Sequence, residues 1–299
     1  MKTIQAMATG AVVALTVGAM HARADETRRA LNDLTGQFAS LDAVSLGARV
    51  TVTVHEAIPG AGVPVGEPIE GFFEYAADGA RWRRSSVLDA SKFPGMNTTV
   101  AYDGSAYSYT MRDQKITSVS FAGPRRATGM SLPNPILELG RFCAPGDDLN
   151  TDLLLASVRA GARAGVTPVE IRPRDGGGAT VRCAGDRIDG AQTMFDLTFD
   201  APGRVVRVER RDAATGAAMS VIECDSHVER RGADGRVAQW PTRFTFLGMD
   251  PATGQAGVTI EMELVWLTTG TDAAGSVSFS PAWSEPGRIW IDELGLFIR

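Results

Sequence analysis

The feature that most constrains the fold is a series of alternating segments joined by Asp-Gly pairs. Between Arg49 and His55, valine alternates with polar residues, as in a strand with one buried face. Asp78-Gly79 and Asp103-Gly104 separate further strand-like runs, and Asp-Gly accepts the positive φ angles of tight hairpin turns. The first half of the chain therefore predicts an antiparallel meander.

Similar segments recur along most of the chain. Strands are expected over 49–55, 69–75, 81–87, 98–102, 106–110, 116–121, around Val169, 180–183, 193–199, 205–211, 219–228, 242–247 and 258–267, with 288–291 as a candidate last strand. We expect a sheet of about ten strands, which is large enough to curl or close.

Two regions break this alternation. From Thr27 onward, apolar residues recur at steps of three and four, which predicts an amphipathic helix with Leu31, Leu34, Phe38 and Leu41 on one face. Between 132 and 165 the same spacing predicts two short helices. Asp147, Asp148 and Asp152 lie near the expected start of the second helix. Negative charge there complements the helix dipole, so we expect these residues to cap the helix rather than to bind a cation.

The N-terminus has the pattern of an export signal. Lys2 precedes an apolar run over 6–20, and Ala22 and Ala24 supply the small side chains of a cleavage site, so we expect cleavage after Ala24. About 15 apolar residues are fewer than the roughly 20 that span a bilayer. Residues 1–24 are thus expected to be a signal peptide, 25–269 one continuous β domain and 270–299 a C-terminal tail. The mature chain would be periplasmic or secreted, with no transmembrane segment.

Charge and missing motifs exclude several functions. The formal net charge is −5, and removing Lys2 and Arg23 makes it more negative, which argues against a nucleic-acid partner. The chain has no nucleophile elbow, zinc-protease helix or phosphate-binding loop. Beyond the leader the only histidines are His55 and His227, which could share a metal only if their strands adjoin. We expect no enzyme, no cofactor and no metal.

Cys143, Cys183 and Cys224 are widely spaced and allow one disulfide at most. In an oxidising compartment a bond between Cys183 and Cys224 and three buried free thiols both remain open.

Aromatic residues gather in the first meander. If the sheet is curved, one set of alternating side chains lines its concave face, where it could form ordinary core or an apolar ligand cavity covered by the helices. The residues expected to line that cavity are Phe73, Tyr75, Trp82, Tyr107 and Tyr109.

The order of these features resembles the periplasmic outer-membrane lipoprotein-carrier (LolA/LolB-like) superfamily. The resemblance rests on the leader, the amphipathic helix and the alternating strand, followed by Gly71-Phe-Phe-Glu-Tyr75, Arg81-Trp82 and Ala101-Tyr-Asp-Gly-Ser-Ala-Tyr107. The later segments 195–200 and 204–212, followed by Gly216, resemble its second-half hairpin. The chain departs from the pattern in its greater length, around 58–68, in the helical region and in the tail, and in its cysteines.

The resemblance implies a mainly β protein with a few helices (α+β): a strongly curved, incompletely closed antiparallel sheet, or half-barrel, with helices over its concave mouth. It further implies an exported carrier that takes up lipid or the acyl chains of lipoproteins. A non-enzymatic envelope sensor or protein-interaction scaffold on the same fold is the alternative, because fold alone does not fix function.

Overall fold

The computed structural model describes residues 25–57, 62–93, 95–121, 132–144, 155–175, 177–188, 191–231, 237–250, 252–270, 273, 279, 287–292 and 294–298. The expected signal peptide, the acidic residues Asp147, Asp148 and Asp152, and part of the loop over 58–68 lie outside these ranges.

Within the described ranges, fifteen strands form a single sheet. They are β1 Ala43–Val54, β2 Pro68–Asp78, β3 Arg81–Leu88, β4 Thr98–Tyr102, β5 Tyr107–Met111, β6 Ile116–Ser120, β7 Pro168–Pro173, β8 Ala179–Ile188, β9 Ala191–Phe199, β10 Val205–Asp212, β11 Ala218–Arg231, β12 Val237–Met249, β13 Ala256–Thr269, β14 Arg288–Ile291 and β15 Leu296–Ile298. The expected count of about ten was too low. The candidate strand at 288–291 exists as β14, and β15 extends the sheet beyond it.

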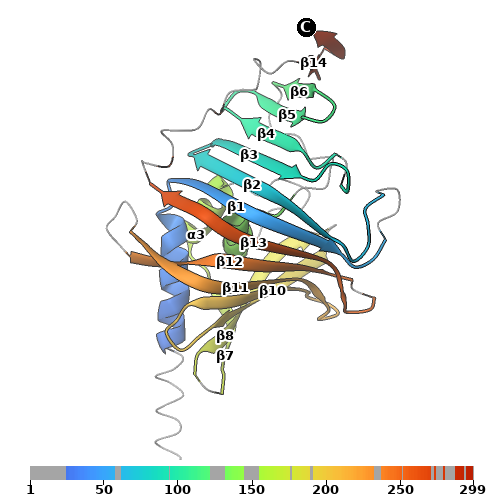
Figure 1. Ribbon diagram of the computed structural model, residues 1–299. Coiled ribbons are helices and arrows are strands. Elements are labelled where there is room, and N and C mark those ends of the chain that lie inside the picture. Colours follow the sequence, from blue (N-terminus) through green and yellow to red (C-terminus); the bar gives the residue numbers. More distant parts are fainter. Residues whose placement is uncertain are drawn as a thin grey trace, which may run out of the picture.

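The sheet consists of two meanders that meet at β1 (Figure 1). Its order is β15-β14-β6-β5-β4-β3-β2-β1-β13-β12-β11-β10-β9-β8-β7. Every neighbouring pair is antiparallel except β14 and β6, which are parallel. We call β2–β6 with β14 and β15 the aromatic arm, and β7–β13 the helix-roofed arm. The pair β1–β13 joins them, with Val50 opposite Met262.

The helices lie together on one side of the sheet, beside β1, β13 and β12 (Figure 1). The N-terminal helix covers residues 25–39, and α2 Pro135–Gly140, the 3₁₀ turn η1 Arg141–Cys143 and α3 Leu155–Ala164 follow β6. Asn134 starts α2 because its side-chain oxygen accepts from the amides of Ile136 and Leu137 at 3.1 and 3.2 Å. The three expected helices are present, but the first ends at residue 39, so Leu41 lies just beyond it, and residues 145–154 lie outside the described ranges.

Alternation along β1 explains how sheet and helices share one core. Val44, Leu46, Ala48, Val50, Val52 and Val54 are almost fully buried on the inner face. Against this face pack Leu31, Leu34, Phe38 and Leu41 of the N-terminal segment. The Phe38 ring meets Trp240 of β12 edge-on at 5.4 Å and Phe142 of η1 at 6.3 Å. The sheet is open and strongly curved, so the expected fold class is confirmed.

A buried charge cluster fastens η1 to the sheet. Asp186 of β8 is fully buried and accepts from Arg141 at 3.1 Å, from Thr193 at 2.7 Å and from Arg210 of β10. Arg141 also holds Glu138 of α2 through two contacts of 2.8 Å. The cluster thus pairs two arginines with two carboxylates, and buried charges of opposite sign must be paired in this way to be stable.

The three cysteines are free and buried. Cys183 lies on β8 and Cys224 on β11, three strand spacings or about 14 Å apart across the sheet, which is too far for a disulfide. Burial raises the pKa of both thiols to about 12, so they stay protonated near neutrality. A Cys183–Cys224 bond is excluded.

Among the described residues, no helix has both the length and the apolar character needed to cross a membrane.

Candidate functional site

The five aromatic residues expected to line a cavity all lie on the inner face of the aromatic arm. Phe73 and Tyr75 stand on β2, Trp82 on β3, and Tyr107 and Tyr109 on β5. The strand register places Trp82 and Tyr107 on either side of Tyr102 in one cross-strand row. The Trp82 and Tyr107 rings are in contact, with centroids 6.2 Å apart. The structure thus brings the set together on one face.

These side chains belong to the main core. Phe73, Tyr75, Trp82 and Tyr107 are at most 6 % exposed, whereas Tyr109 is half-buried. Burial raises the pKa of the Tyr109 hydroxyl, and nearby Arg84 opposes that rise only partly. The indole Nε1 of Trp82 is buried without a hydrogen-bond partner among the described residues. The set is therefore mainly apolar and includes a few buried polar atoms.

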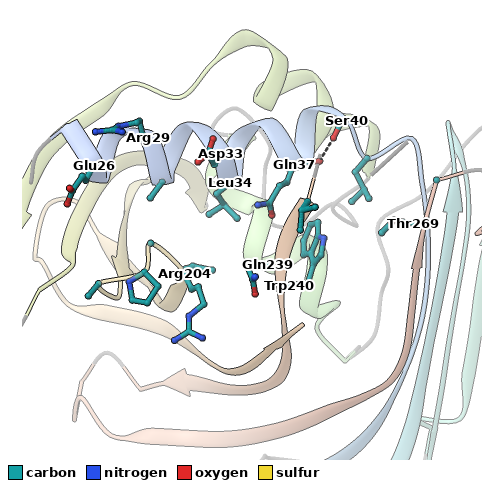
Figure 2. A pocket seen from close by; sticks show the side chains of 18 residues that line it. Glu26, Arg29, Asp33, Leu34, Gln37, Ser40, Arg204, Gln239, Trp240 and Thr269 are labelled. Carbon is teal, nitrogen blue, oxygen red and sulfur yellow. Dashed lines mark hydrogen bonds between the residues drawn. The ribbon is translucent and has the colours of Figure 1, made fainter. Parts of the chain in front are cut away.

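A pocket of about 640 Å³ opens in the other arm, beneath the N-terminal helix (Figure 2). This volume falls in the range of about 300–1,000 Å³ that is usual for small-molecule sites. Its walls come from four segments far apart in sequence: the helix, the turn between β9 and β10, the start of β12 and the end of β13. The lining residues are Glu26, Arg29, Ala30, Asp33, Leu34, Gln37, Ser40, Leu41, Ala201, Pro202, Gly203, Arg204, Val205, Val237, Gln239, Trp240, Thr269 and Gly270.

The pocket has an apolar floor and a charged rim. Leu34, Leu41, Val205 and Trp240 are core residues, so the floor is continuous with the interior of the protein. Exposed Glu26, Arg29 and Asp33 form the rim. The fourth charged residue, Arg204, is already held by Asp200, through contacts of 2.7 and 2.8 Å. The arrangement suits an amphiphilic ligand better than a wholly polar one.

One row of paired residues connects the pocket with the aromatic set. Thr269 of the pocket is opposite Val44, Val44 is opposite Ala77, and Ala77 is opposite Trp82. Three strand spacings separate Thr269 from Trp82, which is about 14 Å. Both features therefore lie at the same end of the sheet and on its inner face.

Sequence reasoning did not identify the pocket. The helix and its apolar face were predicted, but the partner surface depends on the return of β12 and β13 to β1. One local signal existed: Pro202-Gly203 marked a turn, and a Cβ on Gly203 would stand 3.4 Å from the Cβ of Ala30. Only the fold shows that this turn faces the helix.

The two histidines do not meet. His55 follows β1 and its Nε2 lies 2.8 Å from the Thr259 hydroxyl, while the Nε2 of His227 on β11 lies 2.9 Å from the Val205 carbonyl oxygen. Strands β13 and β12 separate β1 from β11. Over the described ranges, no group of three or more His, Cys, Asp or Glu side chains could hold a metal ion.

No family model and no curated protein sequence matches the chain. Solved structures do match in fold. One is a LolA superfamily protein from Nitrosomonas europaea, with 9 % identity and a TM-score of 0.45, covering 82 % of this chain and 93 % of that one. Another is a putative outer membrane lipoprotein-sorting protein domain from Vibrio parahaemolyticus, with 8 % identity, a TM-score of 0.42 and coverage of 80 % and 92 %. A DUF1329 family protein from Desulfovibrio piger has 11 % identity, a TM-score of 0.45 and coverage of 86 % and 94 %. The superfamily that the sequence resembles is thus among the matches, and the likeness concerns the fold alone.

Proposed function

We propose that this protein is an exported, non-enzymatic binding or carrier protein for an apolar ligand, such as a lipid or the acyl chain of a lipoprotein. The observation that carries the proposal is the pocket beneath the N-terminal helix, whose floor consists of core residues and whose rim is charged. A ligand with an apolar chain and a polar end would satisfy both parts of this surface.

The aromatic set is proposed as the far end of the same binding region. A chain entering beside Thr269 would follow the inner face toward Trp82, where Phe73, Tyr75, Tyr107 and Tyr109 supply apolar contacts. Because most of these side chains are buried, the ligand would have to displace neighbouring core contacts to reach them. The rim would remain in water with the polar end.

Export to the periplasm is part of the proposal and rests on the leader. Expression of the full chain through the secretory route should give a mature protein that begins at Asp25. Intact mass and N-terminal sequencing check this, and a secreted protein that retains residues 1–24 would contradict it.

The ligand itself is tested by native mass spectrometry with lipid extraction, on protein purified without detergent. We expect a bound lipid or acylated peptide. The variant Ala30→Trp should lose it, because the larger side chain fills the pocket. Asn32→Trp is the matched control, since Asn32 is exposed on the same helix and does not line the pocket. Trp82 or Tyr107 replaced by a charged residue should also lose the ligand if the chain reaches the aromatic set.

A clean apo mass together with no uptake of added fatty acids would overturn the carrier proposal. One observation would then favour the sensor or scaffold alternative: Leu294, Leu296 and Phe297 next to or in β15 are 65 %, 43 % and 48 % exposed. Exposed apolar side chains at a sheet edge are typical of partner-binding surfaces. Capture of a specific envelope protein that is lost on Phe297→Ser would support that alternative.

A further inference from the structure

We propose that the pocket beneath the N-terminal helix selects amphiphiles whose polar end is a primary ammonium group. This inference rests on the proposed function and names the class of head group that the same site would take. Three features of the lining favour a cation that donates hydrogen bonds: a carboxylate, an unpartnered amide oxygen and an indole ring.

The amide oxygen belongs to Gln37. Its Oε1 is buried and has no hydrogen-bond partner among the described residues, although the side chain extends from the helix into the pocket, toward Gln239 and Trp240 (Figure 2). An unmet buried acceptor costs free energy that a donor on a ligand would recover. Carboxylate and phosphate oxygens cannot act as that donor, whereas an ammonium group carries three N–H bonds.

The carboxylate belongs to Asp33, which precedes Gln37 by four residues. Side chains at this spacing are neighbours on one helix face, with Cβ atoms about 5–6 Å apart, so one ammonium group can contact both. Asp33 is exposed and forms no ion pair within the part of the chain that the structure describes. Removal of the leader after Ala24 would put an α-ammonium group beside Glu26, whereas Asp33 lies two turns farther along the helix. Asp33 is therefore the carboxylate that a ligand ammonium group can reach together with Gln37, although exposed Arg29, four residues before it on the same face, competes for its charge.

Trp240 supplies the third feature. Its indole lines the pocket below Gln37 and is held edge-on against Phe38. An ammonium group near an indole face gains a favourable cation–π interaction, while an anionic head gains none. The rim cations do not reverse this preference, because Asp200 already neutralises Arg204 and only Arg29 is left to meet an acidic group. Arg29 suits the phosphate of a zwitterionic head.

The test compares three lysophospholipids with the same acyl chain, each below its micellar concentration, by calorimetric titration into the lipid-free mature protein. Lysophosphatidylethanolamine has an ammonium group with N–H donors, lysophosphatidylcholine has a quaternary ammonium without them, and lysophosphatidylglycerol is anionic. We expect the ethanolamine lipid to bind about tenfold more tightly than the glycerol lipid, with the choline lipid between them. Phosphoethanolamine without a chain should show no measurable binding.

Two variants locate the preference. Gln37→Leu keeps the bulk of the side chain and removes the oxygen. It should weaken binding of the ethanolamine lipid about tenfold. Asp33→Asn should weaken binding of the ethanolamine lipid up to about fivefold, as expected for the loss of an exposed ion pair. Asp33→Asn should not weaken binding of the glycerol lipid, because it removes a negative charge beside an anionic head group. Gln37→Leu should weaken binding of the glycerol lipid less than that of the ethanolamine lipid, because hydroxyl groups can also donate to the lost oxygen. Glu74→Gln, which alters an exposed carboxylate on the outer face of β2, is the control and should change neither affinity.

The outcomes separate this inference from the proposed function. Equal binding of all three lipids would overturn the ammonium preference and leave the carrier in place. A preference that survives both Gln37→Leu and Asp33→Asn would overturn its location. Binding of phosphoethanolamine alone would replace the amphiphile with a small amine. Failure of every lipid to bind would overturn the carrier proposal itself.

Discussion

The two arms of the sheet bury their inner faces in different ways. In the aromatic arm, strands that are consecutive in sequence supply rings such as Trp82 and Tyr107, which contact each other across the sheet. In the helix-roofed arm the inner face packs against helices, and the Phe38 ring contacts both Phe142 of η1 and Trp240 of β12. The described pocket lies in the second arm, where four segments that are far apart in sequence leave a space between them.

The outer faces differ as well. In the aromatic arm, hydroxyl groups pair between strands, such as Ser85 with Thr99 at 3.3 Å and Thr110 with Thr117 at 3.0 Å. These side chains are buried, and Phe279 of the tail lies nearby, under the guanidinium of Arg81. The outer face of the helix-roofed arm instead carries arginine–carboxylate pairs. The first arm thus buries hydroxyl groups on part of its outer face, whereas the second carries charged pairs on its outer face and the pocket on its inner side.

The largest test of this contrast is Asp186→Asn. The substitution would leave Arg141 and Arg210 buried around a neutral side chain, so we expect a loss of about 3–5 kcal/mol in the free energy of unfolding. Asp42→Asn is the matched control, since Asp42 also contacts two arginines but its side chain is 63 % exposed. It should cost about 1 kcal/mol or less by urea denaturation. Similar losses of stability for both variants would mean that the buried charge cluster around Asp186 does not stabilise the attachment of η1 to the sheet.

Phe38→Ala tests whether the N-terminal helix is core or a detachable cover. Phe38 is fully buried, so its truncation should cost about 3–5 kcal/mol and leave a single unfolding transition, seen alike by circular dichroism and tryptophan fluorescence. Phe297→Ala, at an exposed ring of the aromatic arm, should cost about 1 kcal/mol or less. A separate early transition in Phe38→Ala would show that the helix opens independently of the sheet.

The contrast also explains how much the sequence could predict. Hairpins such as β2–β3 follow from local turn chemistry, because Gly79 takes a φ of +60° directly after Asp78. The pairing of β1 with β13 joins residues about two hundred positions apart and has no local signal. The aromatic set could be named because its strands are consecutive. The pocket could not be named, since its walls become neighbours only when the second meander returns to β1.

Gly161→Ala tests how closely α3 and η1 pack against each other. A Cβ at this position of α3 would lie 1.5 Å from the carbonyl oxygen of Cys143, so backbone must move to admit it. We expect a loss of about 1–3 kcal/mol despite the better helix propensity of alanine. Gly257→Ala is the control, because its Cβ would meet nothing closer than 3.9 Å. Stabilisation by Gly161→Ala would show that α3 and η1 are loosely packed.

The smallest expected effect concerns the ion pairs on the outer face of the helix-roofed arm. Burial alone would raise the pKa of Asp196, but Arg182, with two contacts of 2.7 Å, and Arg211 outweigh it and hold that pKa below its ordinary value. Because the folded pKa is lowered, the carboxylate adds stability above its unfolded pKa of about 3.9 and loses that contribution as the pH falls through the folded value.

Asp196→Asn should therefore cost about 1 kcal/mol at pH 7, and the difference from wild type should shrink on acidification below pH ~4. Denaturation at a series of pH values measures both quantities. Glu261→Gln, at an exposed outer-face carboxylate with no ion pair among the described residues, should show neither. If the difference instead persists at low pH, Asp196 stabilises the arm through neutral hydrogen bonds, and the outer face owes less to charge than its arginine–carboxylate pairs suggest.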